Sequence, residues 1–292
     1  MLGTSLAQAL RQQGATVCRL VRRPTQASDE LTWNPDASIG IIDQDSLDAI
    51  QPTAAVHLSG ANVASHRWTA AYKQQMRDSR VRTTQVLAES LARMKQPPRV
   101  LVIASAVGFY GDRGDTILDE TSNPGEGFFP ELCTAWEAAS RLAEDAGIRV
   151  VHLRLGMVIG RNAGAMARLA PLFRLGLGGR LGNGRQWMSW ISESDALRTI
   201  LFALSNDTLS GPVNAVAPEP VTNTTFTRQL GRAVHRPAIL PAPAFALRLA
   251  FGEMADEALL ASTRAVPVRL LDAGFVFEHP NITQAFAAAL AP

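Results

Sequence analysis

The sequence predicts an α/β fold with a doubly wound parallel sheet. One observation is the segment 100–106, which begins with four apolar residues and carries a hydroxyl, Ser105, near its end. A strand that helices cover on both faces is apolar throughout, whereas a half-exposed strand alternates apolar and polar residues. A second observation is the alternation of strand-like and helix-like segments up to residue 160, which is typical of parallel strands joined by right-handed crossovers.

The first elements of the chain form half of a βαβ unit. Residues 3–13 have the spacing of an amphipathic helix that ends at Gly14, and residues 15–21 predict a strand. The strand that would precede this helix, and most of the phosphate-binding glycines of a dinucleotide-binding turn, are absent from the sequence. Gly3 stands where the third glycine would pack the helix on the sheet. A mis-chosen initiator and a genuine truncation both explain this start, and the choice between them is open.

Two basic residues, Arg22 and Arg23, follow the predicted strand 15–21. In a dinucleotide-binding fold an acidic residue at this place holds the ribose hydroxyls of NAD, whereas an arginine accepts the 2′-phosphate of NADP. No acid lies at this strand end, so the position favours NADP. The alternative is a pair of solvated surface charges.

The next strand, residues 54–59, ends in Ser59, Gly60 and Ala61, and a glycine at this place allows the backbone to approach a ligand closely. The ligand crevice of an open α/β sheet lies outside the carboxyl ends of its strands. Ser105 therefore either hydrogen-bonds a substrate oxygen or caps the following turn. The other elements expected up to residue 160 are helices at 68–94 and 131–146 and a strand at 149–155, which leads into Gly156.

The composition changes after residue 160. Residues 161–186 are rich in glycine and arginine, and they form either a segment that closes over an anionic substrate or a plain surface loop. Later elements are expected as helices near 195–206, 222–234 and 244–262, strands at 212–216 and 274–277, and a final alanine-rich helix. We therefore predict a dinucleotide-binding domain at 1–160, incomplete at its N-terminus, and a smaller C-terminal substrate-binding region at 161–292. Residues 190–210 are expected to pack back onto the first domain.

Composition excludes several classes of function. The formal net charge is +2, and no basic run is interleaved with aromatic residues, which argues against nucleic acid as a partner. Two cysteines exclude a disulfide framework and fit a reducing compartment. No apolar stretch reaches the roughly 18 residues of a membrane span, no signal-peptide core opens the chain, and the histidines lack metal-site spacing. We expect a cytoplasmic protein with a small-molecule substrate, without membrane or metal, and its oligomeric state stays open.

Taken together, these residues resemble a known family. It is similar to the extended, sugar-nucleotide epimerase-like form of the short-chain dehydrogenase/reductase superfamily, and more closely to the epimerase-family branch often called YfcH-like. The matching stretches, which run over nearly the whole chain in family order, include residues 57–62, Arg67-Trp68, Asp78-Ser-Arg-Val81, 105–111, 131–137, 154–156, 176–179, 184–187, 189–191 and 252–256.

The resemblance implies a Rossmann-like fold in which these strand ends line an NADP cleft. Arg22 would match the 2′-phosphate position, and Ser105 the catalytic serine of the superfamily. The resemblance also places two sets of residues, namely Ser59, Gly60, Ala61, Leu155, Gly156 and Met157 beside the ribose and nicotinamide, and Arg185, Trp187, Trp190 and Glu253 at the substrate.

The chain departs from the superfamily at its general acid/base, which is a tyrosine followed four residues later by lysine. Neither tyrosine of this chain has that partner, and the matching positions hold Cys133 and Glu137. The candidates for an unorthodox acid/base are Tyr110, Cys133 and Glu137, and the alternative for Tyr110 is a structural phenol. We expect an NADP-dependent oxidoreductase or epimerase-like enzyme acting on a small carbonyl or hydroxyl compound. The alternative is an NADP-binding regulatory protein without turnover.

Overall fold

The computed structural model describes residues 2–36, 42–161 and 163–291. In this part of the chain, the central sheet has four parallel strands in the order β11-β6-β4-β3. The strands are β3 (Ala54–His57), β4 (Val100–Ala106), β6 (Arg149–Leu155) and β11 (Gly211–Ala215). A separate parallel pair, β1 (Arg19–Val21) and β2 (Glu30–Thr32), shares no hydrogen-bonded ladder with these strands.

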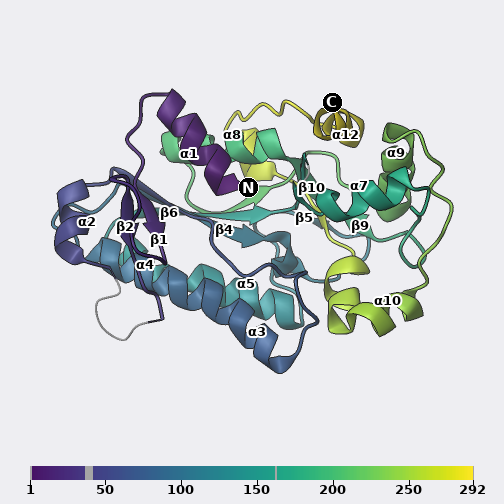
Figure 1. Cartoon of the computed structure of the whole chain (residues 1–292), viewed down its shortest axis with the longest axis horizontal. Helices are drawn as coiled ribbons and strands as arrows, with labels where there is room; N and C mark the ends of the chain where they lie inside the picture. Colours follow the sequence, from purple (N-terminus) through teal and green to yellow (C-terminus); the bar gives the residue numbers. More distant parts are fainter. Residues whose placement is uncertain (1, 37–41, 162, 292) are drawn as a thin grey trace.

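Helices cover both faces of the sheet, as Figure 1 shows with α1 and α8 above it and α3, α4 and α5 below. Their bounds are α1 (Leu2–Gln12), α2 (Gln44–Ile50), α3 (Ala70–Arg77), α4 (Thr83–Ala92), α5 (Phe128–Ala138), α6 (Arg141–Asp145) and α8 (Glu193–Ser205). Short turns lie among them, namely a π-helical turn η1 (Asp78–Arg82) between α3 and α4 and a 3₁₀ turn η2 (Val107–Tyr110) after β4.

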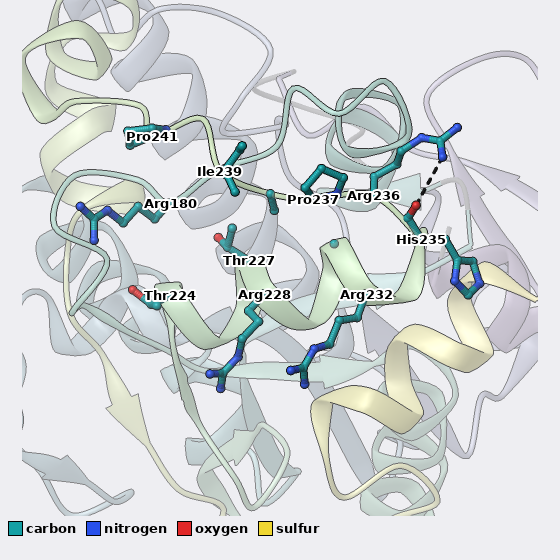
Figure 2. Close-up of a pocket in the computed structure, with 12 residues that line it drawn as sticks. Arg180, Thr224, Thr227, Arg228, Arg232, His235, Arg236, Pro237, Ile239 and Pro241 are labelled. Carbon is teal, nitrogen blue, oxygen red and sulfur yellow. Dashed lines mark hydrogen bonds between the residues drawn. The ribbon is translucent and has the colours of Figure 1, made fainter.

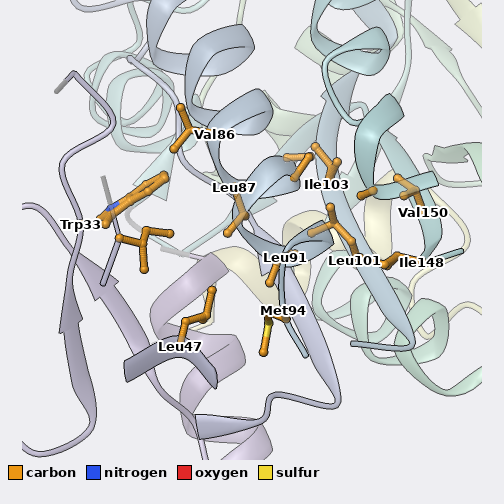
Figure 3. Close-up of a cluster of buried hydrophobic side chains, with 14 of the residues drawn as sticks. Trp33, Leu47, Val86, Leu87, Leu91, Met94, Leu101, Ile103, Ile148 and Val150 are labelled. Carbon is orange, nitrogen blue, oxygen red and sulfur yellow. The ribbon is translucent and has the colours of Figure 1, made fainter. Parts of the chain in front are cut away.

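Successive residues of β4 point alternately into the two hydrophobic cores, one on each face of the sheet. Leu101 and Ile103 pack against α4 in the cluster drawn in Figure 3, which also holds Trp33 from beyond β2. Val100 and Val102 point to the opposite core, with apolar residues of α1 and α8. A strand buried on both faces is apolar in every position, so the predicted doubly wound α/β sheet is confirmed.

Beyond the elements of the central sheet, the described residues contain short strands and five further helices. The strands are β5 (Ile117–Leu118), β7 (Met157–Gly160), β8 (Ala163–Gly164), β9 (Trp187–Met188), β10 (Trp190–Ser192), β12 (Val221–Thr222) and β13 (Arg264–Ala265). The helices are α7 (Met166–Arg174), α9 (Asn223–Ala233), α10 (Ala244–Phe251), α11 (Val268–Asp272) and α12 (Ile282–Leu290), with a π-helical turn η3 (Ala255–Leu259). In the residues that the structure describes, no helix is long and apolar enough to cross a membrane.

Several predicted elements differ from the observed ones. The strand expected at 274–277 is wrong, because its alternating pattern comes from Phe275 and Phe277, which pack on each other and, through Phe275, on Phe202 of α8. The segment 161–186 is not a plain loop, since it contains α7. Each predicted long helix is interrupted: η1 divides 68–94, and 131–146 and 244–262 are each split in two. Of the predicted strand 15–21, the ladder includes Arg19–Val21.

Burial of His57 makes stability depend on pH. Its ring lies at the end of β3, 4% exposed, and burial lowers its pKa to about 4. Above pH 6.5 the ring is neutral in both states. Between pH 6.5 and 4 the unfolded chain binds a proton that the folded chain does not, which costs on the order of 3 kcal/mol by pH 4.

We therefore expect the free energy of unfolding to fall as pH drops from 7 to 4, and His57→Gln to make that fall shallower. Urea unfolding at several pH values measures both proteins. His152, whose pKa burial also lowers, is present in both, so the difference between the two curves isolates His57. Parallel curves would contradict this role of His57.

Candidate functional site

Three polar side chains meet at the carboxyl ends of β4 and β6. Ser105 lies opposite Arg154 in the ladder between these strands. Glu137, near the end of α5, reaches both: the Ser105 hydroxyl donates to Glu137 Oε1 at 2.7 Å, and Arg154 donates from Nε at 2.9 Å and from Nη2 at 2.8 Å. The Arg154 side chain is 4% exposed and that of Glu137 is 13% exposed. A buried cation and a nearly buried carboxylate thus neutralise each other beside the serine.

The network continues from Arg154 into the core. Arg154 Nη1 donates to the phenol oxygen of Tyr110 at 3.0 Å, and that phenol donates to Asn214 Oδ1 at 2.7 Å. The guanidinium also lies 3.4 Å from the centre of the Phe109 ring. Tyr110 and Asn214 are fully buried. The phenol is therefore a fixed link between η2, β6 and β11, and burial raises its pKa.

Cys133 lies one helical turn before Glu137 on α5 and is 1% exposed. Burial, and next the Glu137 carboxylate, raise the pKa of its thiol to about 12. The thiol is thus protonated at neutral pH and offers no surface to a substrate. The structure brings Ser105, Tyr110, Cys133 and Glu137 together, but only Glu137 among the three acid/base candidates keeps an exposed edge.

The C-terminal region fixes the start of α5. Glu257 of η3 accepts from the backbone N–H groups of Phe128 and Phe129, at 2.9 Å each. An anion at a helix N-terminus satisfies free N–H groups and the positive end of the helix dipole. The residue that sets the direction of the helix carrying Cys133 and Glu137 is therefore supplied from the second half of the chain.

The loop of Ser59, Gly60 and Ala61 follows β3 at the same edge of the sheet. Ser59 and Gly60 are exposed, and the Ser59 hydroxyl is 3.2 Å from Nδ1 of His57. The other ring nitrogen of His57 is 3.0 Å from the Thr83 hydroxyl. The loop is thus connected through His57 to the start of α4.

Arg22 and Arg23, which follow β1, have different surroundings. Arg23 donates to both oxygens of Glu30, at 2.8 and 2.7 Å, and this bond holds the pKa of Glu30 at about 2. Arg22 is exposed and lies 5.9 Å from the Trp33 ring, and in the described part of the chain no carboxylate pairs with it. Arg22 is thus the arginine of this pair that is available to an anion.

The remaining predicted cofactor residues show mixed packing. Leu155 and Met157 are half-buried on either side of Gly156. A Cβ at Gly156 would lie 2.8 Å from the Ser189 carbonyl oxygen, so close packing alone requires this glycine. A Cβ at Gly3 would meet no atom within 4 Å, so the structure shows no close contact of α1 with the sheet there.

The predicted substrate residues do not converge. Trp187 donates to Asp115 at 2.7 Å, with Arg264 4.1 Å above its ring. Trp190 is fully buried and donates to the Glu219 carbonyl, which removes it from any surface a substrate could touch. Glu253 is ion-paired to Lys73 of α3 at 2.8 Å. Arg185 is exposed, next to β9.

A separate hollow of about 750 Å³ lies in the second half of the chain, between α9 and the loop 236–241 (Figure 2). Its wall includes four arginines, Arg180, Arg228, Arg232 and Arg236. Figure 2 shows Arg228 and Arg232 extending from the same side of α9, whereas Arg180 and Arg236 lie apart from them and from each other, so the four do not form one cradle. The described residues contain no cluster of three or more His, Cys, Asp or Glu side chains with metal-site geometry.

Sequence reasoning missed Asn214, and gave no role to Arg154 or to Arg80 of η1. Arg154 interrupts the apolar strand β6 in a position that the ladder buries, and this was the signal available. Asn214 stands in the same way inside β11. A polar residue in the middle of a strand buried on both faces needs a partner, because an unpaired buried polar group is costly.

Comparison with known proteins gives consistent results. The model of the NAD dependent epimerase/dehydratase family matches residues 1–215, and that of a domain of unknown function, DUF1731, matches 242–289. An epimerase family protein of Mycobacterium leprae is 45% identical over 289 residues, which cover 99% of this chain and 92% of that protein. The human epimerase family protein SDR39U1 is 34% identical over 293 residues, or 99% of this chain and 96% of that one. The crystal structure of human SDR39U1 (isoform2) with NADPH superposes with a TM-score of 0.89 at 33% identity, covering 99% of this chain and 95% of that one.

Replacement of Tyr110 by phenylalanine tests the structural role of its phenol. The change leaves Asn214 Oδ1 and one Arg154 N–H without a partner, so we expect a loss of roughly 1–3 kcal/mol in the free energy of unfolding by urea. Tyr72→Phe is the matched control, because the Tyr72 hydroxyl donates to one carbonyl, that of Asn62, and a smaller loss is expected. Equal losses in both variants would contradict the network.

Proposed function

The chain belongs to the NAD dependent epimerase/dehydratase family, and we propose that it is an NADPH-dependent oxidoreductase or epimerase-like enzyme of the YfcH-like branch. NADPH would lie along the carboxyl ends of β1, β3, β4 and β6, with the cytoplasmic protein acting on a small carbonyl or hydroxyl compound. Residues 1–160, with 190–210 packed back on them, would bind the cofactor, and 161–292 the substrate. The family model covers residues 1–215, and a relative of high structural similarity was crystallised with NADPH.

The observation that carries the choice of NADPH is the difference between Arg22 and Arg23. Arg23 is held by Glu30, whereas Arg22 at the end of β1 has no carboxylate partner among the residues described. An arginine at this place accepts a 2′-phosphate, for which NADH has no equivalent. The residues present therefore fit the phosphate end of NADPH.

Ser105 is the residue we assign to the substrate carbonyl. Its proton is held by Glu137, which also receives two bonds from Arg154. If the Ser105 hydroxyl turned to a substrate oxygen, Glu137 would keep both arginine bonds, so the turn costs one hydrogen bond. When bound, NADPH would supply a hydride to the carbonyl carbon. The carbonyl oxygen would then take a proton from the Ser105 hydroxyl, and a proton from solvent would restore that hydroxyl.

The alternative is a protein that binds NADPH without turnover. Its support is the state of Cys133 and Tyr110: the thiol has a pKa of about 12, and the phenol is fully buried between Arg154 and Asn214. Neither can act as the ionised tyrosine of the superfamily does. Glu137 is held by two hydrogen bonds from Arg154 and one from Ser105.

Exchange of the two arginines for alanine tests the cofactor. We expect Arg22→Ala to weaken NADPH binding by roughly 10- to 100-fold, the effect of one charge-assisted bond, and to leave NADH binding unchanged. Arg23→Ala is the control: it breaks the bond to Glu30 and lowers stability without changing the ratio of the two affinities. Calorimetry gives both dissociation constants. Weak binding of NADPH to the wild type would sink the proposal.

A second variant, Ser105→Ala, separates the enzyme from the regulatory protein. With a panel of small carbonyl compounds, loss of NADPH absorbance measures turnover. We expect Ser105→Ala to lower kcat by roughly 100-fold or more and to leave the NADPH dissociation constant nearly unchanged. Turnover that survives the substitution contradicts the role of Ser105. Tight NADPH binding with no turnover by the wild type favours the regulatory alternative.

A further inference from the structure

Arg80 is a buried cation on the π-helical turn η1. Its side chain is enclosed so that the residue is 9% exposed, and burial lowers its pKa, although an arginine stays charged. Its guanidinium donates to the carbonyl oxygens of Met76 and Ala61, at 3.2 and 2.9 Å, and to the Ser79 hydroxyl at 3.5 Å. All three acceptors are neutral. Short π-helical turns inside longer helices are frequent at functional sites.

The turn η1 holds the loop 59–61 from behind. The Ala61 N–H donates to the Ser79 hydroxyl at 2.9 Å, and the Ala61 carbonyl accepts from Arg80. A Cβ at Gly60 would lie 3.0 Å from the central carbon of the guanidinium, so the loop rests closely on Arg80 and a larger residue there would require the guanidinium to shift. Both backbone groups of Ala61 are thus set by two adjacent residues of one turn.

The charge of Arg80 is not balanced by an acid. In the described ranges no carboxylate lies within ion-pairing distance of its guanidinium, whereas the charge of Arg154 is balanced by Glu137. The guanidinium lies between the loop 59–61 and α5, 5.1 Å from the Trp136 ring and close enough to Cys133 to affect its pKa. A full positive charge therefore stands directly beneath the exposed loop that follows β3.

We propose that Arg80 determines which redox form of the cofactor the protein holds, by favouring reduced NADPH over oxidised NADP⁺. The inference rests on the proposed function, and on the position beside the ribose and nicotinamide that the family resemblance implies for residues 59–61. The nicotinamide ring carries a positive charge in NADP⁺ and none in NADPH. A buried, unscreened cation behind the loop repels the first and not the second. Arg80 acts through this field and through the loop, without touching the reacting atoms.

The two effects of Arg80 can be separated, because loop position acts equally on both redox forms and charge does not. The quantity to measure is the ratio of the NADP⁺ and NADPH dissociation constants, by calorimetry on the full chain. We expect the wild-type ratio to exceed one. The neutral variants Arg80→Met and Arg80→Gln should lower that ratio by roughly tenfold, which corresponds to about 1.4 kcal/mol.

Two further variants serve as matched controls. Arg80→Lys keeps the charge and loses bonds to the loop, and Ser79→Ala loses the bond to the Ala61 N–H and changes no charge. Both should weaken the two redox forms equally and leave the ratio unchanged. Thermal unfolding identifies any variant that fails to fold, and Arg80→Gln, which keeps polar N–H groups on the side chain, replaces Arg80→Met in that event.

The outcomes distinguish this inference from the function on which it rests. If the wild type binds neither form, the proposed cofactor is wrong. If the wild type binds NADPH but the neutral Arg80 variants keep its ratio, or Arg80→Lys changes the ratio as much as they do, the charge of Arg80 does not select the redox form. A wild-type preference for NADP⁺ would overturn the inference as well.

Discussion

The ion pair between Glu137 and Arg154 is the interaction on which the candidate site depends. Two charges at the carboxyl ends of β4 and β6 are tolerable there because each satisfies the other with two hydrogen bonds. Through Ser105, Tyr110 and Asn214 the same pair connects two further elements, η2 and β11. Removing either charge would leave the other without an opposite charge, so a change at one position alone is costly. The ion pair therefore connects these elements structurally, besides being part of the candidate site.

This ion pair is also consistent with Cys133 and Glu137 standing where the resemblance expects the superfamily's tyrosine and lysine. A carboxylate at the second position raises the pKa of a thiol at the first, to about 12, with burial as the larger cause. A negatively charged residue at the first position would lie beside the Glu137 carboxylate and repel it. The two replacements are therefore consistent with each other. In place of a lysine, two arginines lie near this position: Arg154, whose charge Glu137 balances, and Arg80, whose charge no carboxylate of the described residues balances.

The sequence predicts the sheet well and the site in part. Ser105 is placed at the end of β4 because this buried parallel strand begins with four apolar residues, and strand 149–155 is recovered as β6 although polar residues interrupt it. The failures have physical reasons. Phe275 and Phe277 have the alternating spacing of a strand, but Phe275 packs on Phe202 of α8 and on Phe277. The helix α7 is not predicted because glycines flank it, although Met166, Ala170 and Phe173 have helical spacing. Partners such as Asn214 come from distant strands, and no local pattern predicts which strand supplies them.

The balance of charge at the sheet edge bears on what the site can do. Arg154 and Glu137 cancel, Arg23 and Glu30 cancel, and Arg22 and Arg80 remain, one exposed at the end of β1 and one buried behind residues 59–61. The edge is thus positive at two separated points, the first suited to a phosphate and the second unfavourable to a cationic ring. A ligand that is anionic at one end and neutral at the other satisfies both. NADPH has this distribution and NADP⁺ does not. Arg22 would favour the phosphate, which both forms carry, and Arg80 would disfavour the positively charged ring of NADP⁺. Under the proposed function such a site would retain NADPH and release NADP⁺, which would suit a reductase and, equally, a sensor of the reduced cofactor.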